Sequence, residues 1–346
     1  MLLPNIPAFD EAAAAKAHER QDQLTKPTGS LGQLEDLSIQ VAGITGRERP
    51  SVARKGVIVM AGDHGVVLEG VSAYPPEVTP EMVQNFLHGG AAINVLSRQA
   101  GARVVVVDIG VASDFEDAPG LLRRKIARGT QNFAKGPAMS RAQAEQAIQV
   151  GIDVVEDEIA KGLDLVATGD MGIGNTSPSS AIVAVFSGLP VSQVTGRGTG
   201  VDDAGLARKI AVIEQSIALN QPNPKDPLDV LSKVGGFEIA GLAGVVIGAA
   251  AHRIPVVVDG FISGAAALVA AELVPAVKPY LIASHQSVEI GHKVIWERLG
   301  VKPLLNLGLR LGEGTGAVLA FHLIEAAVRI LNEMATFDEA GVADKE

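Results

Sequence analysis

Six short apolar runs, rich in β-branched residues, recur along the chain, and Gly, Asp or His lies at or just beyond the end of each. Continuous apolar runs of this length, without a polar residue at every second position, are typical of strands buried on both faces. We therefore predict six strands of a buried sheet. They cover Val57–Ala61, Val104–Asp108, Leu163–Thr168, Val256–Asp259, Tyr280–Ala283 and Leu304–Leu307.

Segments with helical periodicity and N-terminal start signals lie between these runs. The signals are Thr79 before Pro80, the capping box Ser140–Gln143, Asp203 before a helix to Leu219, and Ser263 before an alanine-rich helix to Leu273. Strands that alternate with helices form mostly parallel sheets with helices on both faces. The sequence therefore predicts a doubly wound α/β fold.

Both ends of the chain are predicted to be helical. Asp10 opens one helix towards Leu24, and Ser30 with Gln33 makes a capping box for a second helix. A C-terminal helical stripe follows the last predicted strand. Its members are Leu319, Leu323, Ala327, Ile330 and Met334. Because each end carries an apolar stripe that must be covered, we expect residues 1–49 and 313–346 to form a small helical domain beside an α/β nucleotide-binding and catalytic domain, 50–312.

Composition narrows the class of protein. The net charge of −10 and the 3% aromatic content disfavour a nucleic-acid backbone and bases as partners. The absence of cysteine suits a reducing compartment and leaves neither a disulfide nor a thiolate nucleophile. No export signal is visible, and the longest apolar stretch, Ile239–Ala251, is too short for a bilayer. We therefore expect a cytoplasmic protein without a membrane anchor.

Glycine is over-represented, with 39 residues in a chain of 346. Much of the surplus follows the predicted strands, and in open α/β sheets ligands bind just beyond the carboxyl ends of the strands. Glycine there lets the backbone approach a ligand closely, and the helix that follows presents free N–H groups. The segments are Ala61–Gly65, Asp108–Gly110, Thr168–Thr176, Asp259–Gly264, Ala283–His285 and Asn306–Gly308.

The segment Gly169–Thr176 has the composition of an anion cradle, with several glycines before Asn175 and Thr176 open a helix. Backbone N–H groups and hydroxyls could hold one phosphate there, although a tight strand-to-helix turn without a ligand would have the same composition. The segment matches neither the P-loop nor the Rossmann glycine spacing. Lys209 could supply a positive charge, but from the residues alone an ordinary solvated lysine is the simpler interpretation.

Three further groups carry chemistry. Asp63 and His64 follow the first strand as an acid–base pair or as a turn. His285, Glu289 and His292 would share a helical face, but their order is not that of a zinc motif, so no metal site is predicted. Glu313 lies between glycines at the start of the C-terminal helix. It could be a first-turn glutamate favoured by the helix dipole or a general base tuned by burial.

With these motifs in place, the chain resembles the nicotinate-nucleotide:dimethylbenzimidazole phosphoribosyltransferase family over nearly its whole length. The matching segments are Lys26–Pro27, Gly29–Gly32, Leu34–Glu35, Asp63–Val66, Gly136–Ser140, Gly169–Thr176, Asn220–Pro224, Leu231–Phe237, Asp259–Phe261 and Arg310–Gly316. The resemblance implies a doubly wound domain with a small helical domain, a homodimer, and catalysis without a metal, a cofactor or phosphoribosyl pyrophosphate. Its substrates would be nicotinate mononucleotide and a benzimidazole-type base.

The resemblance also implies roles for single residues. Glu313 matches the catalytic base, and Asp170 matches an acidic residue near the nucleotide. Tyr74 and Gln84 fall in the segment that lines the base pocket, although Tyr74 stands where some relatives are expected to have a smaller residue. Tyr74 and Phe86 are the nearest aromatic candidates for a flat base. The positions that match the surroundings of the nucleotide phosphate are Gly174, Asn175, Thr176, Lys209 and Gly264.

The expected reaction moves the 5-phosphoribosyl group from nicotinate mononucleotide to 5,6-dimethylbenzimidazole or a related base, giving α-ribazole 5′-phosphate and nicotinate. One alternative is a phosphoribosyltransferase that uses phosphoribosyl pyrophosphate, but the adjacent acidic pair typical of that class is missing after the predicted strands. The other alternative is a regulatory nucleotide-binding module. Glu313 disfavours it, because a module that only binds an anionic ligand has no need of a carboxylate at the site.

Overall fold

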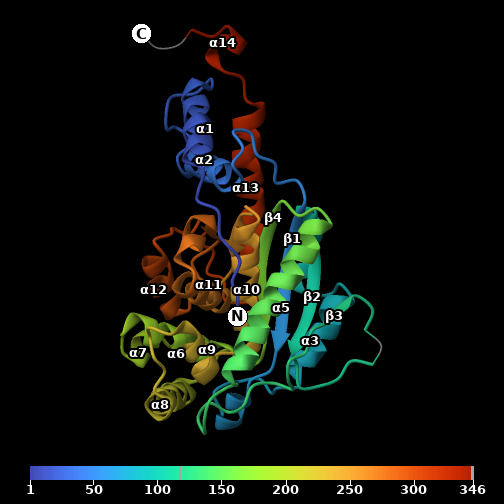
Figure 1. The fold of residues 1–346 in the computed structure, drawn as a ribbon, viewed down its shortest axis with the longest axis vertical. Helices are drawn as coiled ribbons and strands as arrows, with labels where there is room; N and C mark the ends of the chain where they lie inside the picture. Colours follow the sequence, from blue (N-terminus) through green and yellow to red (C-terminus); the bar gives the residue numbers. More distant parts are fainter. Residues whose placement is uncertain (117, 344–346) are drawn as a thin grey trace.

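The computed structural model describes residues 1–116 and 118–343. In that part of the chain six parallel strands form one sheet, in the order β3-β2-β1-β4-β5-β6. Helices surround the sheet (Figure 1), which confirms the predicted α/β fold. The strands are β1 (Lys55–Gly62), β2 (Ala102–Gly110), β3 (Leu121–Arg123), β4 (Leu165–Met171), β5 (Val256–Val258) and β6 (Leu281–Ala283).

The helices occupy the connections between strands and both ends of the chain, and 3₁₀ turns cover Gly65–Glu69 and Pro275–Tyr280. The first seven helices are α1 (Glu11–Gln23), α2 (Gln33–Thr45), α3 (Val78–Leu87), α4 (Ala92–Ala100), α5 (Arg141–Ala160), α6 (Thr176–Ser187) and α7 (Val191–Val194). The others are α8 (Asp203–Asn220), α9 (Pro227–Val234), α10 (Phe237–Ala251), α11 (Phe261–Leu273), α12 (Ile290–Leu299), α13 (Thr315–Glu333) and α14 (Phe337–Ala340).

Alternate residues of β1 serve two separate cores, one on each face of the sheet. Ile58 and Met60 belong to the core under α10 and α11, whereas Val57 and Val59 belong to the core under α3, α4 and α13. From β1 the chain passes outwards through β2 to β3 and then returns to β4, on the other side of β1. A reversal of this kind opens a crevice at the carboxyl ends of the strands, which is where ligands bind in such sheets.

Two strand predictions need correction. The segment Leu304–Leu307 was predicted as a strand, but Leu305 makes only an isolated bridge to His285, and Leu307 is 57% exposed. The three-residue strand β6 offers too short an edge to pair a full strand beyond it. The edge strand β3 was not predicted, because Leu121–Arg123 carries a single buried residue and therefore has no continuous apolar run.

The helix starts divide into correct and wrong predictions. The Asp10 cap and the Ser140–Gln143 capping box are confirmed. Asp202, one residue earlier than expected, caps α8 through Gly205. Ser30 is not a cap: α2 begins after Gly32, and Glu35 turns back to accept from the Leu31 N–H and to pair with Lys26 at 2.8 Å.

Two hydroxyl residues expected before helices lie inside them. Thr79 is in the first turn of α3, where its Oγ1 accepts a hydrogen bond of 3.1 Å from the Ile173 N–H, and Ser263 is the third residue of α11. The predicted stripe on α13 is wrong except at Ala327. The face that the rest of the protein buries includes Ala317, Ala320, Phe321, Ile324, Val328 and Leu331, because α13 packs on the sheet as well as on α2 and α4.

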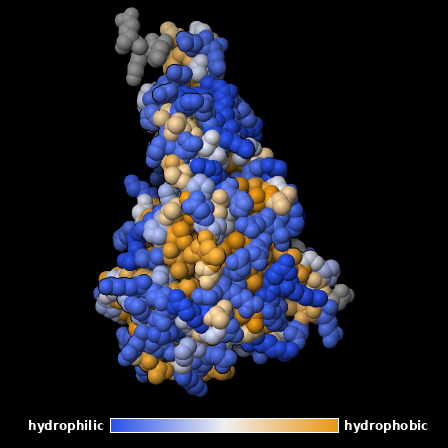
Figure 2. Space-filling view, viewed as in Figure 1, coloured by the Kyte–Doolittle hydropathy of each residue, from blue (hydrophilic) through white to orange (hydrophobic). Residues whose placement is uncertain are grey.

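The terminal helices α1, α2 and α13 pack together at one end of the molecule, and α13 also reaches β4 and β5 (Figure 1). This end is largely hydrophilic in Figure 2, whereas apolar side chains gather on the middle of the same face, over the sheet part. Within the described residues α13 alone is long and apolar enough to cross a membrane, but 56% of its apolar window is buried in the protein. Such burial is typical of a core helix.

The division of the chain into a helical domain, 1–49 with 313–346, and an α/β domain, 50–312, stays a prediction.

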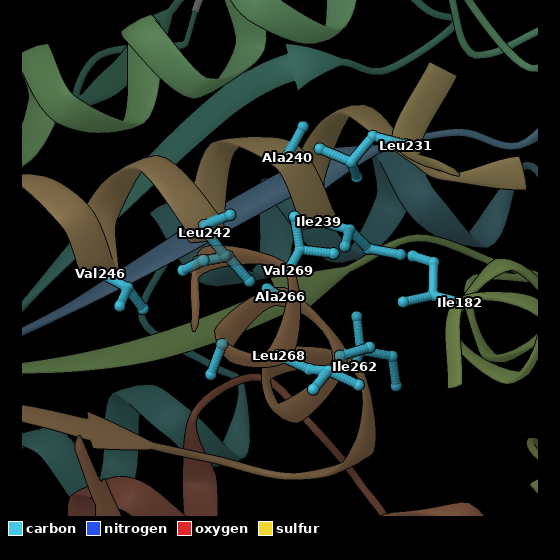
Figure 3. Close-up of a cluster of buried hydrophobic side chains, with 14 of the residues drawn as sticks. Ile182, Leu231, Ile239, Ala240, Leu242, Val246, Ile262, Ala266, Leu268 and Val269 are labelled. Carbon is cyan, nitrogen blue, oxygen red and sulfur yellow. The ribbon is translucent and has the colours of Figure 1, made fainter. Parts of the chain in front are cut away.

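Helix α10 is apolar on all sides and lies in the core between α5, α11 and the sheet. The close-up in Figure 3 shows Leu242 and Ile239 of α10 above Leu268 and Ile262 of α11, with Ile182 of α6 at the right. Glycine permits the close crossing of α10 over α5, because a Cβ at Gly244 or Gly151 would overlap the backbone of the other helix. The apolar stretch set aside as too short for a membrane is therefore a core helix.

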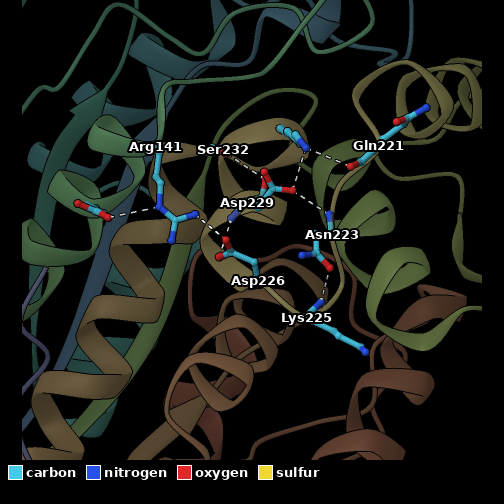
Figure 4. A network of polar contacts seen from close by, with 9 residues as sticks. Arg141, Gln221, Asn223, Lys225, Asp226, Asp229 and Ser232 are labelled. Atoms are coloured by element: carbon cyan, nitrogen blue, oxygen red, sulfur yellow. Dashed lines mark hydrogen bonds and ion pairs between the residues drawn. The ribbon is translucent and has the colours of Figure 1, made fainter.

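A polar network orders the loop before α9 and ties it to α5 (Figure 4). Asp226 accepts from Arg141 at 2.7 Å and from the Asp229 N–H at 3.2 Å, where it caps α9. Asp229 in turn accepts from the Asn223 N–H at 2.8 Å and from Lys233 at 2.9 Å. Side-chain caps and ion pairs therefore fix the conformation of the loop before α9.

Candidate active site

A cavity of about 430 Å³ opens at the carboxyl ends of β4 and β5. Its walls come from the loop after β4, the start of α11, the segment after β6, and the segment before α13, with α3 on one side. The side chains and backbone that line it are Tyr74, Val78, Met82, Asp170–Ile173, Asn175, Thr176, Gly198, Thr199, Gly260–Ile262, His285, Ser287, Glu289 and Arg310–Glu313. The cavity lies at the edge of the sheet where the glycine surplus predicted a ligand site.

One part of the cavity is built from polar groups around the start of α6. Gly174 has a left-handed backbone (φ +88°), after which Asn175 and Thr176 lead into the helix. Lys209 on α8 donates a hydrogen bond of 2.6 Å to Thr176 Oγ1. The Lys209 side chain is only 1% exposed, and this burial lowers its pKa to about 8 despite the nearby Glu289 carboxylate. A positive helix end with a buried cation is a ready-made place for an anion.

A second glycine loop, which contains Gly196 and Gly198, meets the glycine loop before α6 at Lys209. Gly198 has a left-handed backbone, and a Cβ there would lie 3.1 Å from Lys209 Nζ. The buried Glu289 carboxylate holds this loop by accepting a hydrogen bond of 3.0 Å from the Gly198 N–H. A Cβ at Gly196 would overlap the Glu289 carboxylate, so a larger residue there would push Glu289 aside. The two glycine loops therefore converge on one lysine and one threonine.

Glu313 lines the cavity from the segment before α13, where it is 5% exposed. Burial raises the pKa of its carboxyl from the ordinary 4.5 to about 7, opposed by a hydrogen bond of 3.3 Å from the Ile93 N–H and aided by the Asp259 charge. The Glu313 backbone is left-handed (φ +65°) between two left-handed glycines. A non-glycine residue in this conformation is uncommon and must be held there by its surroundings.

Asp170 at the end of β4 adds a second carboxyl to the same wall. Its Oδ2 accepts a hydrogen bond of 3.0 Å from Asn175, and its Oδ1 has no partner among the described residues. The pKa of this carboxyl is raised well above 3.8. Burial is the largest cause, and the negative charge of Asp259 is the next. The cavity therefore contains two carboxyl groups that hold protons more readily than free ones.

The remaining wall is apolar. Val78 and Met82 of α3 line the cavity together with Met171 at the end of β4 and Ile173 just after it, and Phe261 supplies a ring. Tyr74 stands at the rim and is 53% exposed. Phe86, a candidate ring in the sequence, is instead 2% exposed in the core beneath α3. This wall offers flat apolar space next to the Glu313 carboxylate.

The structure brings most of the predicted site residues together. Glu313, Asp170, Asn175, Thr176 and Tyr74 line the cavity, and Lys209 contacts it through Thr176. The other three lie further back. Gly174 forms the turn beneath the cavity, Gly264 lies on α11 facing His292 and Ile295, and Gln84 is half-buried on α3.

Asp63 and His64 lie behind the loop after β4. Asp63 Oδ2 accepts a hydrogen bond of 2.8 Å from the Ala112 N–H, so it ties the loop after β1 to the loop after β2 and does not close a turn of its own. His64 Nε2 is 2.7 Å from Glu238 Oε1, and both side chains are fully buried. Burial lowers the pKa of His64, but the Glu238 charge and hydrogen bond outweigh it, so the net shift is upwards. A Cβ at Gly172 would lie 3.2 Å from His64 Nε2, which places this ion pair directly under the cavity floor.

The histidines near Glu289 serve packing and hydrogen bonding. His292 Nδ1 accepts from the Ser287 N–H at 3.0 Å, and the ring packs on Trp296 with centroids 4.4 Å apart. Burial lowers the pKa of His292 to about 3. Across residues 1–116 and 118–343, no group of three or more His, Cys, Asp and Glu is arranged to hold a metal ion.

Comparison with known proteins identifies the family. A phosphoribosyltransferase family model, DBI_PRT, matches residues 6–342. The nicotinate-nucleotide–dimethylbenzimidazole phosphoribosyltransferase of Chloroflexus aggregans is 63% identical over 99% of this chain and 97% of its own length. The enzyme of the same name from Roseiflexus sp. strain RS-1 is 64% identical, again over 99% of this chain and 97% of its own length. The chain belongs to this family.

A solved member of the nicotinate-nucleotide–dimethylbenzimidazole phosphoribosyltransferase family has the same fold. CobT from Thermus thermophilus superimposes with a TM-score of 0.93 at 48% identity, over 96% of this chain and all of that one. The resemblance inferred from the motifs is therefore confirmed.

Several residues that line the cavity of the present protein were not predicted as site residues from the sequence, among them His285, Ser287, Glu289 and Arg310. His285 and Ser287 follow the fifth predicted strand in the chain, and Arg310 opens the motif that contains Glu313, so their positions offered a signal. Glu289 was weighed only as a metal ligand.

Proposed function

We propose that the protein transfers the 5-phosphoribosyl group of nicotinate mononucleotide to 5,6-dimethylbenzimidazole or a related base, which gives α-ribazole 5′-phosphate for cobalamin assembly and releases nicotinate. The names of the relatives support this proposal. The observation that carries it is the Glu313 carboxyl, which is buried between an anion cradle and an apolar wall and has a pKa raised to about 7. A general base is most effective when its pKa lies near the working pH.

The 5′-phosphate is assigned to the two glycine loops. Thr176, the N-terminus of α6 and Lys209 supply a hydroxyl, a helix dipole and a charge at one place. A bound phosphate dianion favours the protonated form of Lys209, whose pKa burial has lowered to about 8. Asp170, at the end of β4 and hydrogen-bonded to Asn175, is proposed to face the nucleotide.

The base is assigned to the apolar wall beside Glu313. Met82, Met171 and Phe261 provide polarizable and aromatic surface for a flat ring, and Tyr74 closes the rim. Gln84 is proposed to support this wall from within α3. The exposed Tyr74 side chain is the residue we expect to influence which base is accepted.

The residues suffice for the proposed step. The glycosidic bond of nicotinate mononucleotide runs to a positively charged pyridinium nitrogen, so its breakage leaves nicotinate with the electron pair and needs no general acid. One nitrogen of the benzimidazole forms the new bond to C1′, while Glu313 takes the proton from the other nitrogen. Attack on the face opposite nicotinate inverts C1′ and gives the α-anomer. The reaction consumes neither a metal nor a cofactor.

The other predicted properties are proposals too. We expect a cytoplasmic homodimer with neither a membrane nor a nucleic acid as partner. The apolar surface on the middle of the face in Figure 2 supports the dimer, because monomers rarely expose large apolar areas. We also propose that residues 1–49 and 313–346 act as a helical domain beside the catalytic domain.

Incubation with nicotinate mononucleotide and 5,6-dimethylbenzimidazole tests the function directly. We expect equimolar nicotinate and α-ribazole 5′-phosphate, separated by chromatography and identified by mass. A parallel reaction with phosphoribosyl pyrophosphate and Mg²⁺ in place of the mononucleotide should give no α-ribazole 5′-phosphate. Release of nicotinate without a base, or turnover only with phosphoribosyl pyrophosphate, contradicts the proposal.

A further inference from the structure

The Asp259 carboxylate holds the backbone that directly follows Glu313. Asp259 directly follows β5 and is fully buried. Its Oδ2 accepts a hydrogen bond of 3.1 Å from the Gly314 N–H, and its Oδ1 accepts one of 3.0 Å from the Ala317 N–H. These are first-turn donors of α13, which otherwise starts without a side-chain cap within the described chain. Asp259, at the end of β5, therefore serves as the side-chain cap of α13.

The backbone that Asp259 clamps is an unusual one. Gly312, Glu313 and Gly314 all have positive φ, at +86°, +65° and +95°. Glycine tolerates this conformation, but a glutamate is found there only when surrounding contacts impose it. Thr315 ties the other end of the turn by donating from Oγ1 to the Gly312 carbonyl at 2.9 Å. The direction of the Glu313 side chain thus depends on a turn that Asp259 and Thr315 close.

Asp259 is itself held firmly. Its N–H donates to Thr168 Oγ1 on β4 at 3.4 Å, and its carbonyl accepts from Ser284 Oγ at 3.3 Å. His285 Nε2 lies 3.6 Å from its Oδ1. Residues on β4 and just after β6 therefore hold the Asp259 backbone, and His285 lies beside its carboxylate, which makes Asp259 a fixed reference point for the segment that contains Glu313.

We propose that Asp259 is a positioning residue for Glu313, because its carboxylate locks the left-handed turn that aims the Glu313 carboxylate into the cavity. Of the effects that this proposal predicts, only the change in activity rests on the proposed function. The clamp itself is a contact that can be measured without turnover. The charged or titratable groups that face Glu313 are Asp259 after β5, Asp170 on β4, His285 after β6 and Arg310 on its own segment.

The variant Asp259→Asn keeps the size of the side chain, but its NH₂ group cannot accept the second backbone hydrogen bond, and the charge is lost. We expect kcat to fall by 10- to 100-fold while the KM of each substrate stays within threefold. Removal of the repelling charge should also move the acid limb of the kcat profile to lower pH. A role in stability alone would leave the kcat of the folded variant unchanged, and that result overturns the proposal.

Asp108→Asn is the matched control. Asp108 also lies near the end of a strand, is 2% exposed and accepts a hydrogen bond of 2.9 Å from a loop N–H, that of Val111. It lies on β2, which β1 and β4 separate from β5. This variant should lose stability yet keep wild-type kcat and acid limb. A drop in kcat equal to that of Asp259→Asn argues against a specific role for Asp259.

Amide hydrogen exchange of the wild-type protein tests the clamp independently of activity and of whether the variant folds. The Gly314 and Ala317 amides should exchange at least 100-fold more slowly than unprotected amides, and Asp259→Asn should accelerate at least one of them by more than tenfold. Free exchange of both amides in the wild type overturns the proposal. If the wild type releases no nicotinate, the proposed function fails, while protected amides still support the clamp.

Discussion

The Glu313 carboxylate accepts a hydrogen bond from the Ile93 N–H, 3.3 Å away in the first turn of α4. A carboxylate at a helix N-terminus is normally favoured in its charged form. Here burial outweighs this stabilisation and the nearby Asp259 charge adds to the effect, so the pKa rises to about 7. Glu313 is thus held in place by a helix end and remains basic enough to take a proton, which leads to the first two predictions.

Replacement of Glu313 by Gln should lower kcat by about 10²- to 10⁴-fold, the usual contribution of a positioned base. The amide has the same shape and still accepts from the Ile93 N–H, so both KM values should stay within threefold. Steady-state kinetics with each substrate varied in turn measure this. Glu333→Gln, at the exposed end of α13, is the control and should behave as wild type. Near wild-type turnover of Glu313→Gln removes Glu313 as the base.

The raised pKa of Glu313 also makes a prediction for stability. The folded protein holds the proton up to about pH 7, whereas the unfolded chain loses it near 4.5, so ionisation costs folding free energy as the pH rises through this window. A shift of this size corresponds to about 3 kcal/mol. Glu313→Gln should therefore be more stable than wild type at pH 8 by up to that amount, and equally stable at pH 4.

Urea unfolding at both pH values measures this difference, with Glu333→Gln as the control that should show no gain in stability at pH 8, because contact with Arg329 lowers the pKa of Glu333. The same titration should appear in catalysis, because only the ionised carboxylate accepts a proton. The kcat of the wild type should fall about tenfold per pH unit below pH 7. A stability gain that is equal at pH 4 and pH 8 contradicts the assigned pKa.

The phosphate assignment predicts a different kinetic signature. Lys209→Met and Thr176→Val should raise the KM of nicotinate mononucleotide by tenfold or more, with little change in the KM of the base. Because the pKa of Lys209 is lowered to about 8, the wild-type KM should also rise above pH 8 as the charge is lost. Lys293→Met, an exposed lysine on α12, is the control. An unchanged KM for the mononucleotide removes both residues from the phosphate site.

The central strands could be predicted from the sequence because they are buried on both faces. β1, β2 and β4 are continuous apolar runs, and each predicted run overlaps the observed strand. β3 could not be predicted, since only Leu121 of its three residues is buried. Leu304–Leu307 has the composition of a strand, but pairing depends on the length of the neighbouring β6, which is a tertiary property.

Whether a site residue could be predicted also depended on whether its contacts are local or distant in the sequence. Gly174, Asn175 and Thr176 are consecutive, so their joint role could be predicted from one motif. The contact of Glu289 with the Gly198 N–H joins residues 91 positions apart, and no pattern in the sequence indicates it. The positive φ of Glu313 was equally invisible, because it is imposed by the Asp259 clamp rather than by its own residue type.

The last prediction concerns the ion pair beneath the cavity floor. His64 and Glu238 are fully buried at 2.7 Å, with His64 Nδ1 and Glu238 Oε2 lacking partners among the described residues. Removal of one member of a buried pair leaves the other charge uncompensated, which typically costs about 3–5 kcal/mol. We expect a loss of this order for His64→Gln at pH 6, and a smaller loss for the double variant His64→Gln/Glu238→Gln.

The pH dependence of this loss follows from the raised pKa of His64. The stabilisation is complete below the unfolded value near 6.5 and is lost as the pH rises through the higher folded value, so the cost of His64→Gln should shrink at alkaline pH. The pair His252–Glu156, 3.0 Å apart but 45% and 44% exposed, is the control. His252→Gln should cost less than about 1 kcal/mol at any pH. Additive single and double variants at His64 and Glu238, measured by urea unfolding, would show that the two side chains do not interact.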